Sequence, residues 1–580
     1  MAESLSKSPA NASPGKSTAL SAFVDSVQTS IDRGSLKYSE WFLKNFKHPR
    51  NDRWAWSFKD HEFQIEIVDQ MSREVEVKKC AQVGLSVAEV RFGLTFCAVN
   101  DYMKAAYVLP TSRFAIEFCT TRIDPAIDSS DYVSSIVSKE VDNSSAKQIG
   151  TCFLLMRGTS GTGSAISQDL DLIITDEKDF CNQDVLGSFA SRLQHSELKW
   201  TRDFSTPTVP DYGISKGYDE SSQAVRMVKH SRCGQWVELK PWDDIVIPGF
   251  DAKVIEFRKK DWNHPGVRSS YLQCPHCHNA IGTRNLNDPE ARQWVHRFPA
   301  VDKKGYHVRP WDVPAYNPLD EVLSSIKRYK LHSDWVNFRL GEDYADAESS
   351  FVVSALRQVP HSGWSLNGVV NAGVVNAFIG SDLGKMAHTL VGVATERGLR
   401  IVSAGRPMVE GLEDKSLGKY IVDLFRRLRG VRTVMDAMPN YETALYVTAS
   451  LPEKQAYGAY FGGQSKSSLD IYEFKDNKGT VHIDRDASFD DVSRAFNSGL
   501  IEFGNIPDEE MKILRKHLSA MKKIKQYTAK GEVMTWISTG EDHYALALNY
   551  LYCAYASVHQ RVVHVTPGVL PKPGGVKIKS

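Results

Sequence analysis

The sequence predicts an α/β protein with two α/β regions separated by a segment rich in cysteine and histidine. Strand and helix patterns alternate as far as residue 212, and a second alternation follows a Gly/Asn/Val-rich connector at residues 363–377. Between these regions, residues 213–310 are rich in aromatic, His, Cys and Pro residues and have few helical patterns. The 580 residues are sufficient for several domains, each with a core of its own.

The composition is that of an ordinary globular protein. Charged residues make up 24% of the chain and the formal net charge is +1, so any contact with nucleic acid must rely on local positive charge. No apolar stretch is long enough to span a membrane, and residues 1–18, rich in Ser, Ala, Lys and Pro, indicate a disordered arm rather than a signal peptide. The nine cysteines, an odd number, predict reduced thiols in a cytoplasm.

Residues 172–177 predict a buried strand that ends in two adjacent carboxylates. Three apolar residues and Thr175 lead directly to Asp176 and Glu177. NTPases present a magnesium-holding Asp and a water-polarising Glu in this way, at the end of a central strand. A strand that ends in Asp-Glu at an ordinary turn is also common, so the neighbouring motifs decide between the two interpretations.

A candidate phosphate-binding loop lies upstream, at residues 78–86. Compared with the usual pattern G-x-x-x-x-G-K-[ST], Gly84 and Ser86 match the second glycine and the hydroxyl, whereas Leu85 replaces the lysine and Lys79 replaces the first glycine. Backbone N–H groups around Gly84 can bind phosphates, Ser86 can bind magnesium, and Lys79 can reach the β/γ-phosphates from the front of the loop. An ordinary strand-to-helix turn would leave the same pattern.

A Ser/Thr cluster, Ser205-Thr206-Pro207-Thr208, follows the next predicted strand. In this order, the lysine-first loop, the Asp-Glu strand and the Ser/Thr cluster resemble the ASCE-type P-loop ATPase of the large terminase subunit of tailed bacteriophages, in particular its lambda-like branch. The resemblance implies that Gln64, which precedes the loop, contacts adenine. It also implies that Ser205 and Thr206 couple hydrolysis to movement, and that Arg122 acts as an arginine finger in trans.

The middle segment contains two short knuckles that can hold a metal. Cys274-Pro275-His276-Cys277 has the C-x-x-C spacing, and His230 and Cys233 form a similar pair upstream. Two such pairs can close a tetrahedral zinc site with the ligands His230, Cys233, Cys274 and Cys277, with His276 or His278 as substitutes for His230. The site would be structural, because four protein ligands leave no position for water. The lambda-like branch usually has cysteine at the first position, and two unrelated cysteine turns are the alternative interpretation.

The second α/β region places three acids where a nuclease needs them. Asp382 and Asp436 end apolar strands, and Asp542 begins a helix. Three such carboxylates can hold two divalent metals about 4 Å apart for phosphodiester cleavage. Single acids at strand ends are common, but after the ATPase motifs the trio resembles the RNase H-like nuclease of the same family. The resemblance implies that these three residues bind Mg²⁺ or Mn²⁺ and are catalytic together with Glu177 of the ATPase.

Two basic clusters flank the proposed acidic site. Residues 512–530 contain seven Lys or Arg residues and no acid, and residues 426–432 contain four arginines. Such runs are usually solvated faces, but next to a nuclease they favour contact with the DNA backbone. We find no pattern that indicates base-specific recognition.

These motifs divide the chain into six predicted segments. They are a flexible arm and helix (1–50), an ATPase core (51–212), a zinc-knuckle insertion (213–310), a helical lid or linker returning to the ATPase (311–362), an RNase H-like nuclease (363–565) and a flexible basic tail (566–580).

The resemblance implies a genome-packaging motor that drives double-stranded DNA into a viral procapsid and cuts concatemeric DNA with a metal-dependent endonuclease. ATP, Mg²⁺ (or Mn²⁺ in the nuclease) and structural Zn²⁺ would be its cofactors. A portal protein, the small terminase subunit and further copies in a ring would be its partners, in the host cytoplasm and away from membranes. A helicase or translocase without nuclease activity, and a non-enzymatic zinc-bearing portal adaptor, are the alternative hypotheses. The second is favoured by Leu85 at the lysine position.

Overall fold

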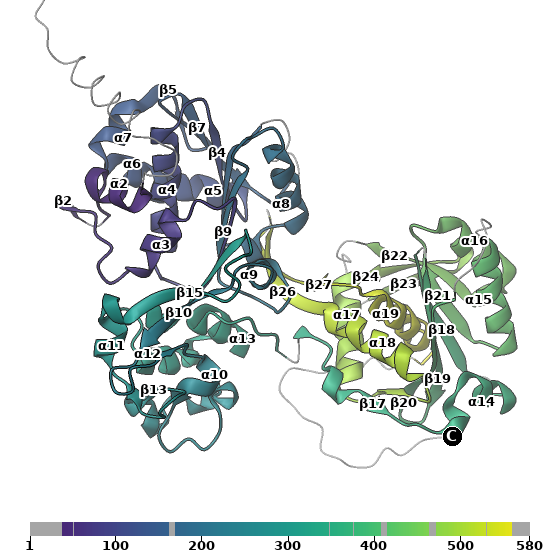
Figure 1. The fold of residues 1–580 in the computed structure, drawn as a ribbon. Coiled ribbons are helices and arrows are strands. Elements are labelled where there is room, and N and C mark those ends of the chain that lie inside the picture. The colour runs from purple at the N-terminus through teal and green to yellow at the C-terminus, as the bar shows by residue number, and fades with distance from the viewer. Residues whose placement is uncertain are drawn as a thin grey trace, which may run out of the picture. The chain divides into compact units, whose positions relative to one another are not determined.

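The computed structural model describes most of the chain as two compact units (Figure 1). The first unit extends to Ala345 and includes Lys525–Val533, and the second contains Asp346–Ile524 and the residues from Met534 onward. The predicted basic tail and most of the predicted N-terminal arm lie outside the described residues, and α2 (Tyr38–Asn45) is the first helix described. The described residues are 37–49, 51–161, 169–346, 349–374, 376–384, 386–407, 415–462, 471–528 and 531–559.

One large sheet forms the centre of the first unit. Within the described residues it has eleven strands, and its middle strands are parallel, as expected for an α/β fold. In spatial order the strands are β11 (Trp236–Val237), β10 (Ala224–Lys229), β16 (Lys304–Val308), β3 (Glu74–Lys79), β9 (Trp200–Ser205), β8 (Leu172–Asp176), β4 (Lys104–Leu109), β7 (Cys152–Gly158), β6 (Ala146–Ile149) and β5 (Val137–Asn143), with β15 (Arg292–His296) paired to β10.

Helices cover both faces of this sheet, which is why its central strands are apolar throughout. Every residue of β8 is buried. On one face α4 (Leu85–Val99) packs in the main core, and on the other face α8 (Gln183–Ala190) covers β4 and β8 with Val185 and Phe189 (Figure 1). Smaller helices complete the unit: α3 (Phe63–Asp69), α5 (Ser112–Phe118), α6 (Asp124–Asp128), α7 (Asp131–Ile136) and α9 (Gly213–Asp219).

The structure extends the first sheet beyond the segment predicted as the ATPase core. We predicted that the core ends at residue 212, but β10, β15 and β16 all come from the segment 213–310 that was assigned to the insertion. The reason is that β16 pairs in parallel with β3, next to the candidate phosphate loop. The part of the insertion with its own core contains a three-stranded sheet and short helices: β12 (Ile245–Val246), β13 (Tyr271–Gln273), β14 (Ala280–Ile281), α10 (Pro241–Asp244) and α11 (Thr283–Asn287).

The segment predicted to return to the ATPase, 311–362, is divided between the two units. Its first part has the short helices α12 (Leu319–Ser324) and α13 (His332–Trp335) and belongs to the first unit. From Asp346 onward it belongs to the second unit. There, Phe351 is buried in the core and β17 (Arg357–Gln358) pairs with β25 (Ile501–Phe503), so our predicted boundary at 362 lies too far along the chain.

A mixed sheet forms the centre of the second unit. Three antiparallel strands, β20, β19 and β18, are followed by the parallel strands β21 and β22, and β18 and β19 form a hairpin. The bounds of the sheet strands not yet given are β18 (Ala377–Leu383), β19 (Ala387–Thr395), β20 (Gly398–Gly405), β21 (Arg432–Asp436), β22 (Ala456–Gly462), β23 (Tyr472–Lys475) and β24 (Thr480–Asp484).

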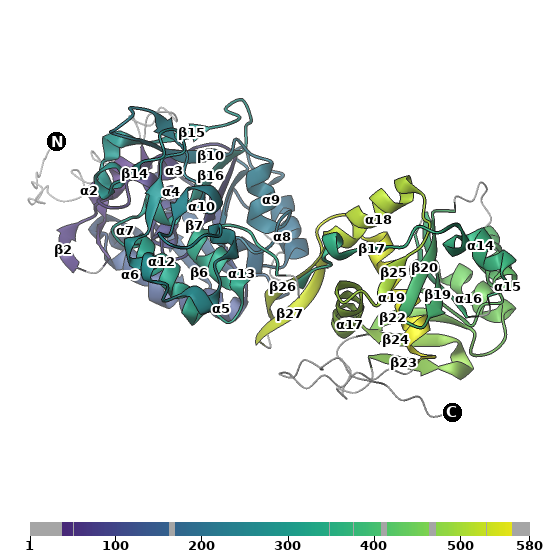
Figure 2. The ribbon, with the colours of Figure 1, turned by 90° about the horizontal axis from the view of Figure 1, so that it is seen from below.

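Two groups of helices enclose the second sheet, and both views show them on opposite faces (Figures 1 and 2). One group packs in a core with Ile379 and Val391, and the other in a core with Phe378 and Leu390. Neighbouring residues of the same strand therefore point into different cores, as the strand period of two requires. The first group is α14 (Leu366–Asn371), α15 (Lys415–Arg427) and α16 (Tyr441–Ser450), and the second is α17 (Arg485–Asn497), α18 (Asp508–Ala520) and α19 (His543–Ala556). A separate hairpin is formed by β26 (Met521–Thr528) and β27 (Gly531–Ser538).

All nine cysteines are free thiols in the structure. Six of the nine are buried outside the Cys/His segment, where they pack as small apolar side chains. None of the helices described has both the length and the apolar character that crossing a bilayer requires.

A buried ion pair attaches β9 to α4 in the first unit. Arg202 donates from Nε and Nη2 to the two carboxylate oxygens of Glu89, at 2.7 and 2.8 Å, and both side chains are almost fully buried. The guanidinium also donates to the carbonyl oxygens of Gln70 and Ile67 and lies 3.9 Å from the ring centroid of Phe92. Both charged groups therefore have hydrogen-bond partners in place of water, which is the condition under which a buried charge is tolerated.

We predict that Glu89→Gln lowers the free energy of unfolding of the first unit by about 3–5 kcal/mol, because it leaves the guanidinium of Arg202 buried without a counter-charge. Glu117→Gln is the matched control, since Glu117 pairs with Arg113 on the surface, where both side chains are more than half exposed. The control should change stability by less than about 1 kcal/mol. Urea unfolding of the full chain, with the transition of each unit followed separately, measures both effects. Equal effects of the two substitutions would contradict the assignment.

Candidate active sites

The predicted ATPase residues meet at one edge of the first sheet. The strands β3, β9 and β8 are neighbours and parallel, with Lys78 opposite Ser205 and Asp176 opposite Phe204. Their carboxyl ends therefore lie side by side. Ligands of open α/β sheets bind outside the carboxyl ends of the strands.

The loop after β3 has the backbone that phosphate binding requires. Gly84 has φ of 74° in the left-handed region and is the N-cap of α4. A Cβ at this position would lie 3.2 Å from Gln64 Nε2 and from the ring of His61, so glycine suits both the conformation and the space. The first N–H groups of α4 have no acceptor within the helix, and the helix dipole favours an anion there.

Leu85 cannot take the role of the missing lysine, because its side chain is uncharged; it is buried in the main core of the first unit. The cation comes instead from Lys79 at the end of β3, as the lysine-first pattern predicts. Its Nζ lies 3.3 Å from Oε1 of Glu177, and its side chain is only 6% exposed. Burial alone would lower the pKa of Lys79, but the carboxylates of Glu177 and Asp176 outweigh it and raise the pKa. The ammonium is therefore fixed in its charged form beside both acids.

Asp176 ends β8 and is buried. Its Oδ2 accepts a hydrogen bond of 3.0 Å from the hydroxyl of Tyr107, and its Oδ1 has no hydrogen-bond partner among the described residues. Burial, reinforced by Glu177, raises the pKa of Asp176 to about 7, and Lys79, followed by Ser86, opposes the rise. A buried carboxylate oxygen without a partner, beside a serine hydroxyl at a helix start, has the donor chemistry that Mg²⁺ takes in P-loop NTPases.

Glu177 turns the chain out of β8. Its φ of 56° is left-handed, which is uncommon for a residue with a side chain and is typical of strained functional positions. Besides Lys79, its carboxylate accepts from Ser205 Oγ at 3.5 Å and Thr206 Oγ1 at 3.4 Å. The structure therefore places the predicted water-orienting acid, the loop lysine and the Ser/Thr cluster in direct contact.

Asp179 is a residue of this site that the sequence did not reveal. It is fully buried in the turn after Glu177, and its Oδ2 accepts from both the amide and the hydroxyl of Thr208, at 2.8 and 2.7 Å. Its Oδ1 accepts from the amide of Ile214, and its own amide donates to Ser205 Oγ. Asp179 thereby fixes the Ser/Thr cluster to the Glu177 turn. The only signal in the sequence for this role of Asp179 is its position two residues after Glu177.

A second contact missed from the sequence lies on the front of the loop. The amide of Ala81 donates to the carbonyl of Phe338 at 2.7 Å, and Gly341 packs so closely that a Cβ would lie 2.7 Å from the amide nitrogen of Cys80. Lys78 pairs with Asp343 and lies 3.9 Å from Glu342. The chain after α13 therefore packs directly on the loop.

Gln64 and Arg122 were predicted from the family resemblance alone. Gln64 is buried, and its Nε2 donates to the carbonyl of Val83 at 3.0 Å, so it supports the loop in this structure. Arg122 lies in the π-helical turn Cys119–Ile123 and is exposed. Their roles toward adenine and in trans stay predictions.

The four predicted knuckle residues come together in the insertion. The ligand atoms of His230, Cys233, Cys274 and Cys277 all lie within 4.8 Å of one another. The Sγ atoms of Cys233 and Cys277 lie 3.5 and 3.3 Å from His230 Nδ1, and Cys233 Sγ lies 3.9 Å from Cys274 Sγ. Four ligands around one centre at bond lengths of about 2.0–2.3 Å would have similar separations.

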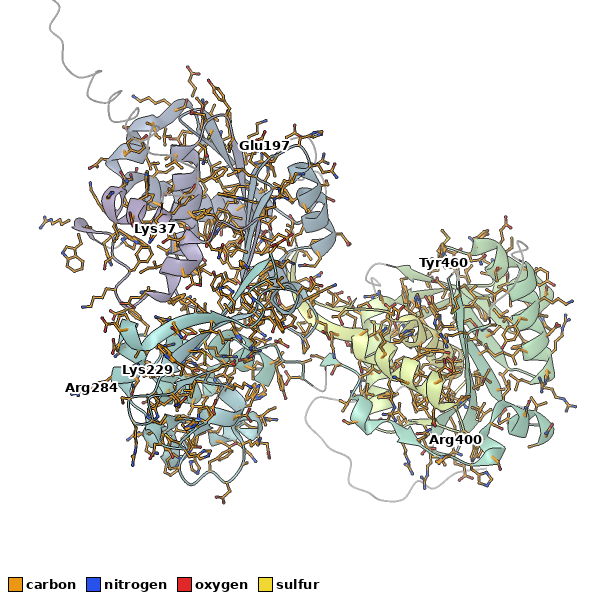
Figure 3. All side chains as sticks on the ribbon, viewed as in Figure 1. Lys37, Glu197, Lys229, Arg284, Arg400 and Tyr460 are labelled. Atoms are coloured by element: carbon orange, nitrogen blue, oxygen red, sulfur yellow. The ribbon has the colours of Figure 1, made fainter. Side chains whose placement is uncertain are left out.

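Local structure explains how the knuckle forms. His230 directly follows Lys229, the last residue of β10, and the carbonyl of Lys229 accepts from Asn285 of α11, the helix that also carries Arg284 (Figure 3). Hydrogen bonding from Asn279 lowers the pKa of the Cys277 thiol to about 6, whereas burial raises the pKa of Cys274. The donor set of one imidazole and three thiols suits Zn²⁺ and not Mg²⁺.

The three predicted acids of the second unit lie at one end of its sheet, but their carboxylate oxygens do not all lie within 4.8 Å of one another. Asp382 lies in β18 and Asp436 ends the parallel neighbour β21, where Ser381 pairs with Met435, so the two acids are at matching positions. Asp542 is the N-cap of α19. Burial raises the pKa of Asp382 to about 6 against the opposing effect of His543, and the charges of Asp436 and Asp542 raise it further. The charges of Asp436 and Asp542 therefore act on Asp382.

Close packing of α19 on β18 determines where Asp542 lies. A Cβ at Gly380 would lie 2.2 Å from the amide of Leu551 and 2.3 Å from the carbonyl of Ala547, so only glycine permits this approach. Burial raises the pKa of Asp436, and hydrogen bonding from Tyr550 of the same helix opposes that rise. The Nδ1 of His543 lies 2.7 Å from Asp382 Oδ2.

Many residues of the predicted basic clusters have partners within the chain. Lys516 pairs with Glu541 at 2.7 Å and Lys523 with Asp490 at 2.6 Å. Arg432 donates to the carbonyl of Lys454 and to the hydroxyl of Ser557. Lys530 lies outside the described residues. Contact of these clusters with DNA stays a prediction.

Comparison with known proteins gives one family match. Residues 52–294 match the sequence model of the family described as phage terminase large subunit gpA, ATPase domain. No curated protein sequence matches the chain.

The solved structures that match the chain include three phage proteins. The HK97 bacteriophage large terminase is 11% identical, with 90% of this chain and 99% of that chain covered and a TM-score of 0.48. The large terminase of a thermophilic bacteriophage is 9% identical, with 85% and 95% covered and a TM-score of 0.28. The large terminase nuclease of the thermophilic phage G20c is 17% identical, with 36% and 98% covered and a TM-score of 0.23.

Proposed function

The chain belongs to the phage terminase large subunit family through its ATPase domain, and we propose that it is the motor subunit that packages viral DNA. In this proposal, ATP hydrolysis in the first unit drives double-stranded DNA into a procapsid, and the second unit cuts concatemeric DNA into genome units. The observation that carries the proposal is the contact of Glu177 with Lys79, Ser205 and Thr206 at the carboxyl edge of the first sheet.

Each residue of the ATPase site has a separate task in this proposal. Lys79 and the N–H groups after Gly84 bind the phosphates and offset the negative charge that spreads over them during transfer. Glu177 orients the attacking water and accepts its proton. When ATP occupies the site, Lys79 turns from Glu177 to the phosphates, and the carboxylate becomes available to water. Ser86 and Asp176 would hold Mg²⁺, which supplies further neutralisation of phosphate charge.

Coupling of hydrolysis to movement is assigned to Ser205 and Thr206. Both hydroxyls contact Glu177, and Asp179 connects their loop to the start of α9. A change in the position of Glu177 would therefore be transmitted to α9 through hydrogen bonds. Arg122 is proposed to complete the site of a neighbouring subunit in a ring on the portal. The portal protein and the small terminase subunit are the proposed partners, in the host cytoplasm.

The nuclease is proposed for the second unit. Asp382, Asp436 and Asp542 would hold divalent metal ions that supply an activated water and stabilise the leaving oxygen. The fit is supported by the electrostatic effect of Asp436 and Asp542 on Asp382 at the end of a sheet in which three antiparallel strands are followed by parallel ones.

The insertion is proposed to be stabilised by structural zinc. Its strands β12, β13 and β14 are two or three residues long, so the segment has little regular structure to hold it. Four ligands from two turns would join the ends of this segment and leave no position for a reacting water.

We expect Glu177→Gln to lower the turnover of ATP by about 10²–10⁴-fold, because the amide cannot accept a proton from water. Binding of ATP should persist, since Lys79 and the loop are unchanged. Glu197→Gln is the control, as Glu197 is exposed in the loop before β9 (Figure 3). Phosphate release and binding of a fluorescent ATP analogue separate the two effects. Unchanged turnover in the variant would favour the non-enzymatic adaptor.

Asp382→Asn is expected to lower cleavage of plasmid DNA by more than about 100-fold with either Mg²⁺ or Mn²⁺, because it removes a charged ligand shared by the acidic site. ATP turnover serves as an internal control for folding and should not change. Asp423→Asn, at an exposed position of α15, should cut at the wild-type rate. Persistent cutting by the Asp382 variant would refute the assignment, and absence of cutting by the wild type would favour a translocase without nuclease activity.

Purified protein should contain about one zinc ion per chain, and Cys277→Ala should lose most of it, because three ligands no longer close the site. Cys97→Ala is the matched control, since Cys97 is buried in α4 and is not one of the proposed zinc ligands. Metal analysis after gel filtration gives the stoichiometry, and thermal unfolding with and without a chelator gives the contribution to stability. Wild-type protein without zinc would refute the knuckle.

A further inference from the structure

A second group of potential metal ligands lies beside the three acids and contains two histidines. The ligand atoms of Asp382, His388 and His543 all lie within 4.8 Å of one another. Asp436 and Asp542 are not members of this group. The donor set is thus one carboxylate and two imidazoles, which differs chemically from the all-acidic set of the proposed nuclease.

The fold itself brings the three residues together. Asp382 and His388 are directly paired across the antiparallel strands β18 and β19, so their side chains lie on the same face of the sheet. His543 is the first residue of α19, which packs on that face. Its ring stacks on the ring of His388, with centroids 4.6 Å apart and planes inclined by 14°.

His388 is buried, and one nitrogen of its ring, Nδ1, has no hydrogen-bond partner among the described residues. The residue is only 5% exposed. A buried nitrogen without a partner is destabilising by about 1–3 kcal/mol, so a bound ligand is the simplest reason for its retention. The hydrogen bond between Asp382 and His543 explains the position of His543 but leaves Nδ1 of His388 without a partner.

His517, a nearby histidine, has the hydrogen-bond partners expected of a structural residue. His517 of α18 is also buried and lies 5.4 Å from the His388 ring, centroid to centroid. Its Nδ1 accepts from the amide of Tyr544 at 3.2 Å, and its Nε2 lies 3.7 Å from Glu541. Both nitrogens of His517 therefore have partners, and it connects α18 to α19. Among the described residues, His388 has no such connection through Nδ1.

We propose that Asp382, His388 and His543 bind a divalent transition-metal ion, and that the two imidazoles make this part of the proposed nuclease site selective for Mn²⁺ over Mg²⁺. The site itself rests on the geometry of three side chains, and its link to DNA cleavage rests on the proposed function. Imidazole nitrogen is a good ligand for first-row transition metals, whereas Mg²⁺ takes oxygen ligands and retains water.

A metal ion bound by His388 and His543 would occupy a second position beside the one that the three acids are proposed to hold. Asp382 is shared between the acidic set and the histidine set, so the two sets lie side by side. A metal position with only oxygen ligands suits Mg²⁺, whereas a position with nitrogen ligands suits a transition-metal ion such as Mn²⁺. The histidine position would retain Mn²⁺ under conditions in which Mg²⁺ is in large excess.

The test measures metal binding by the full chain in the absence of nucleotide and DNA. Mn²⁺ is titrated and free Mn²⁺ is followed by electron paramagnetic resonance, for the wild type, His388→Gln and the control His482→Gln, whose ring stacks on Tyr460 elsewhere in the sheet. Loss of a partner outside the ligand shell already weakens metal binding by about 10- to 100-fold. Loss of His388 should therefore raise the Kd for Mn²⁺ by at least about tenfold, and the control should not change it.

A spectroscopic readout identifies the ligand directly. Electron spin-echo modulation from ¹⁴N on the bound Mn²⁺ should be present in the wild type and in His482→Gln, and weaker in His388→Gln. A wild-type spectrum without ¹⁴N modulation, an unchanged Kd in His388→Gln, or equal affinity for Mg²⁺ and Mn²⁺ would each overturn the inference. Circular dichroism of each variant verifies that the fold is retained.

The outcomes separate this inference from the proposed nuclease. If Mn²⁺ binds through His388 and the protein does not cut DNA, the metal site stands and the nuclease proposal fails. If DNA is cut and the substitution at His388 affects neither the Kd nor the ¹⁴N signal, the nuclease stands and the histidine site fails.

Discussion

The parallel register of β3, β9 and β8 is the constraint on which the ATPase site depends. It places the ends of three strands side by side, so Lys79, Ser205 and Asp176 become neighbours although they are far apart in the sequence. The ion pair between Arg202 and Glu89 attaches the middle strand to α4, the helix that begins at the phosphate loop. A shift of this strand by one residue would turn every side chain to the opposite face and separate the site.

The proposed site of the second unit depends on the close approach of helix α19 to strand β18. Gly380 allows α19 to contact β18 through the backbone, which brings Asp542 and His543 to the acids at the strand ends. The hairpin register then adds His388 to the same face. The proposed metal chemistry of this unit therefore follows from two packing relations, and neither is visible in the spacing of the acids along the chain.

Short local patterns in the sequence predicted which residues lie together. The proposed knuckle ligands His230, Cys233, Cys274 and Cys277 were predicted from spacing, and the structure brings the four together. Sequence reasoning was wrong about boundaries. The core was predicted to end at residue 212, yet β16 pairs with β3, because a strand from a distant segment can complete a sheet without any local signal. The boundary at 362 failed for the same reason, since β17 pairs with β25.

The sequence by itself determined the α/β class, the order of the motifs and the residues at strand ends, because periodicity and apolar runs are local properties. It also indicated that Lys79, and not the residue at position 85, provides the charge of the loop, which the burial of Leu85 supports. Only the tertiary structure decided that Asp179 fixes Thr208, that the chain around Gly341 packs on the loop, and that His388 faces Asp382. These contacts join segments that are remote along the chain, and their existence depends on strand register and helix packing.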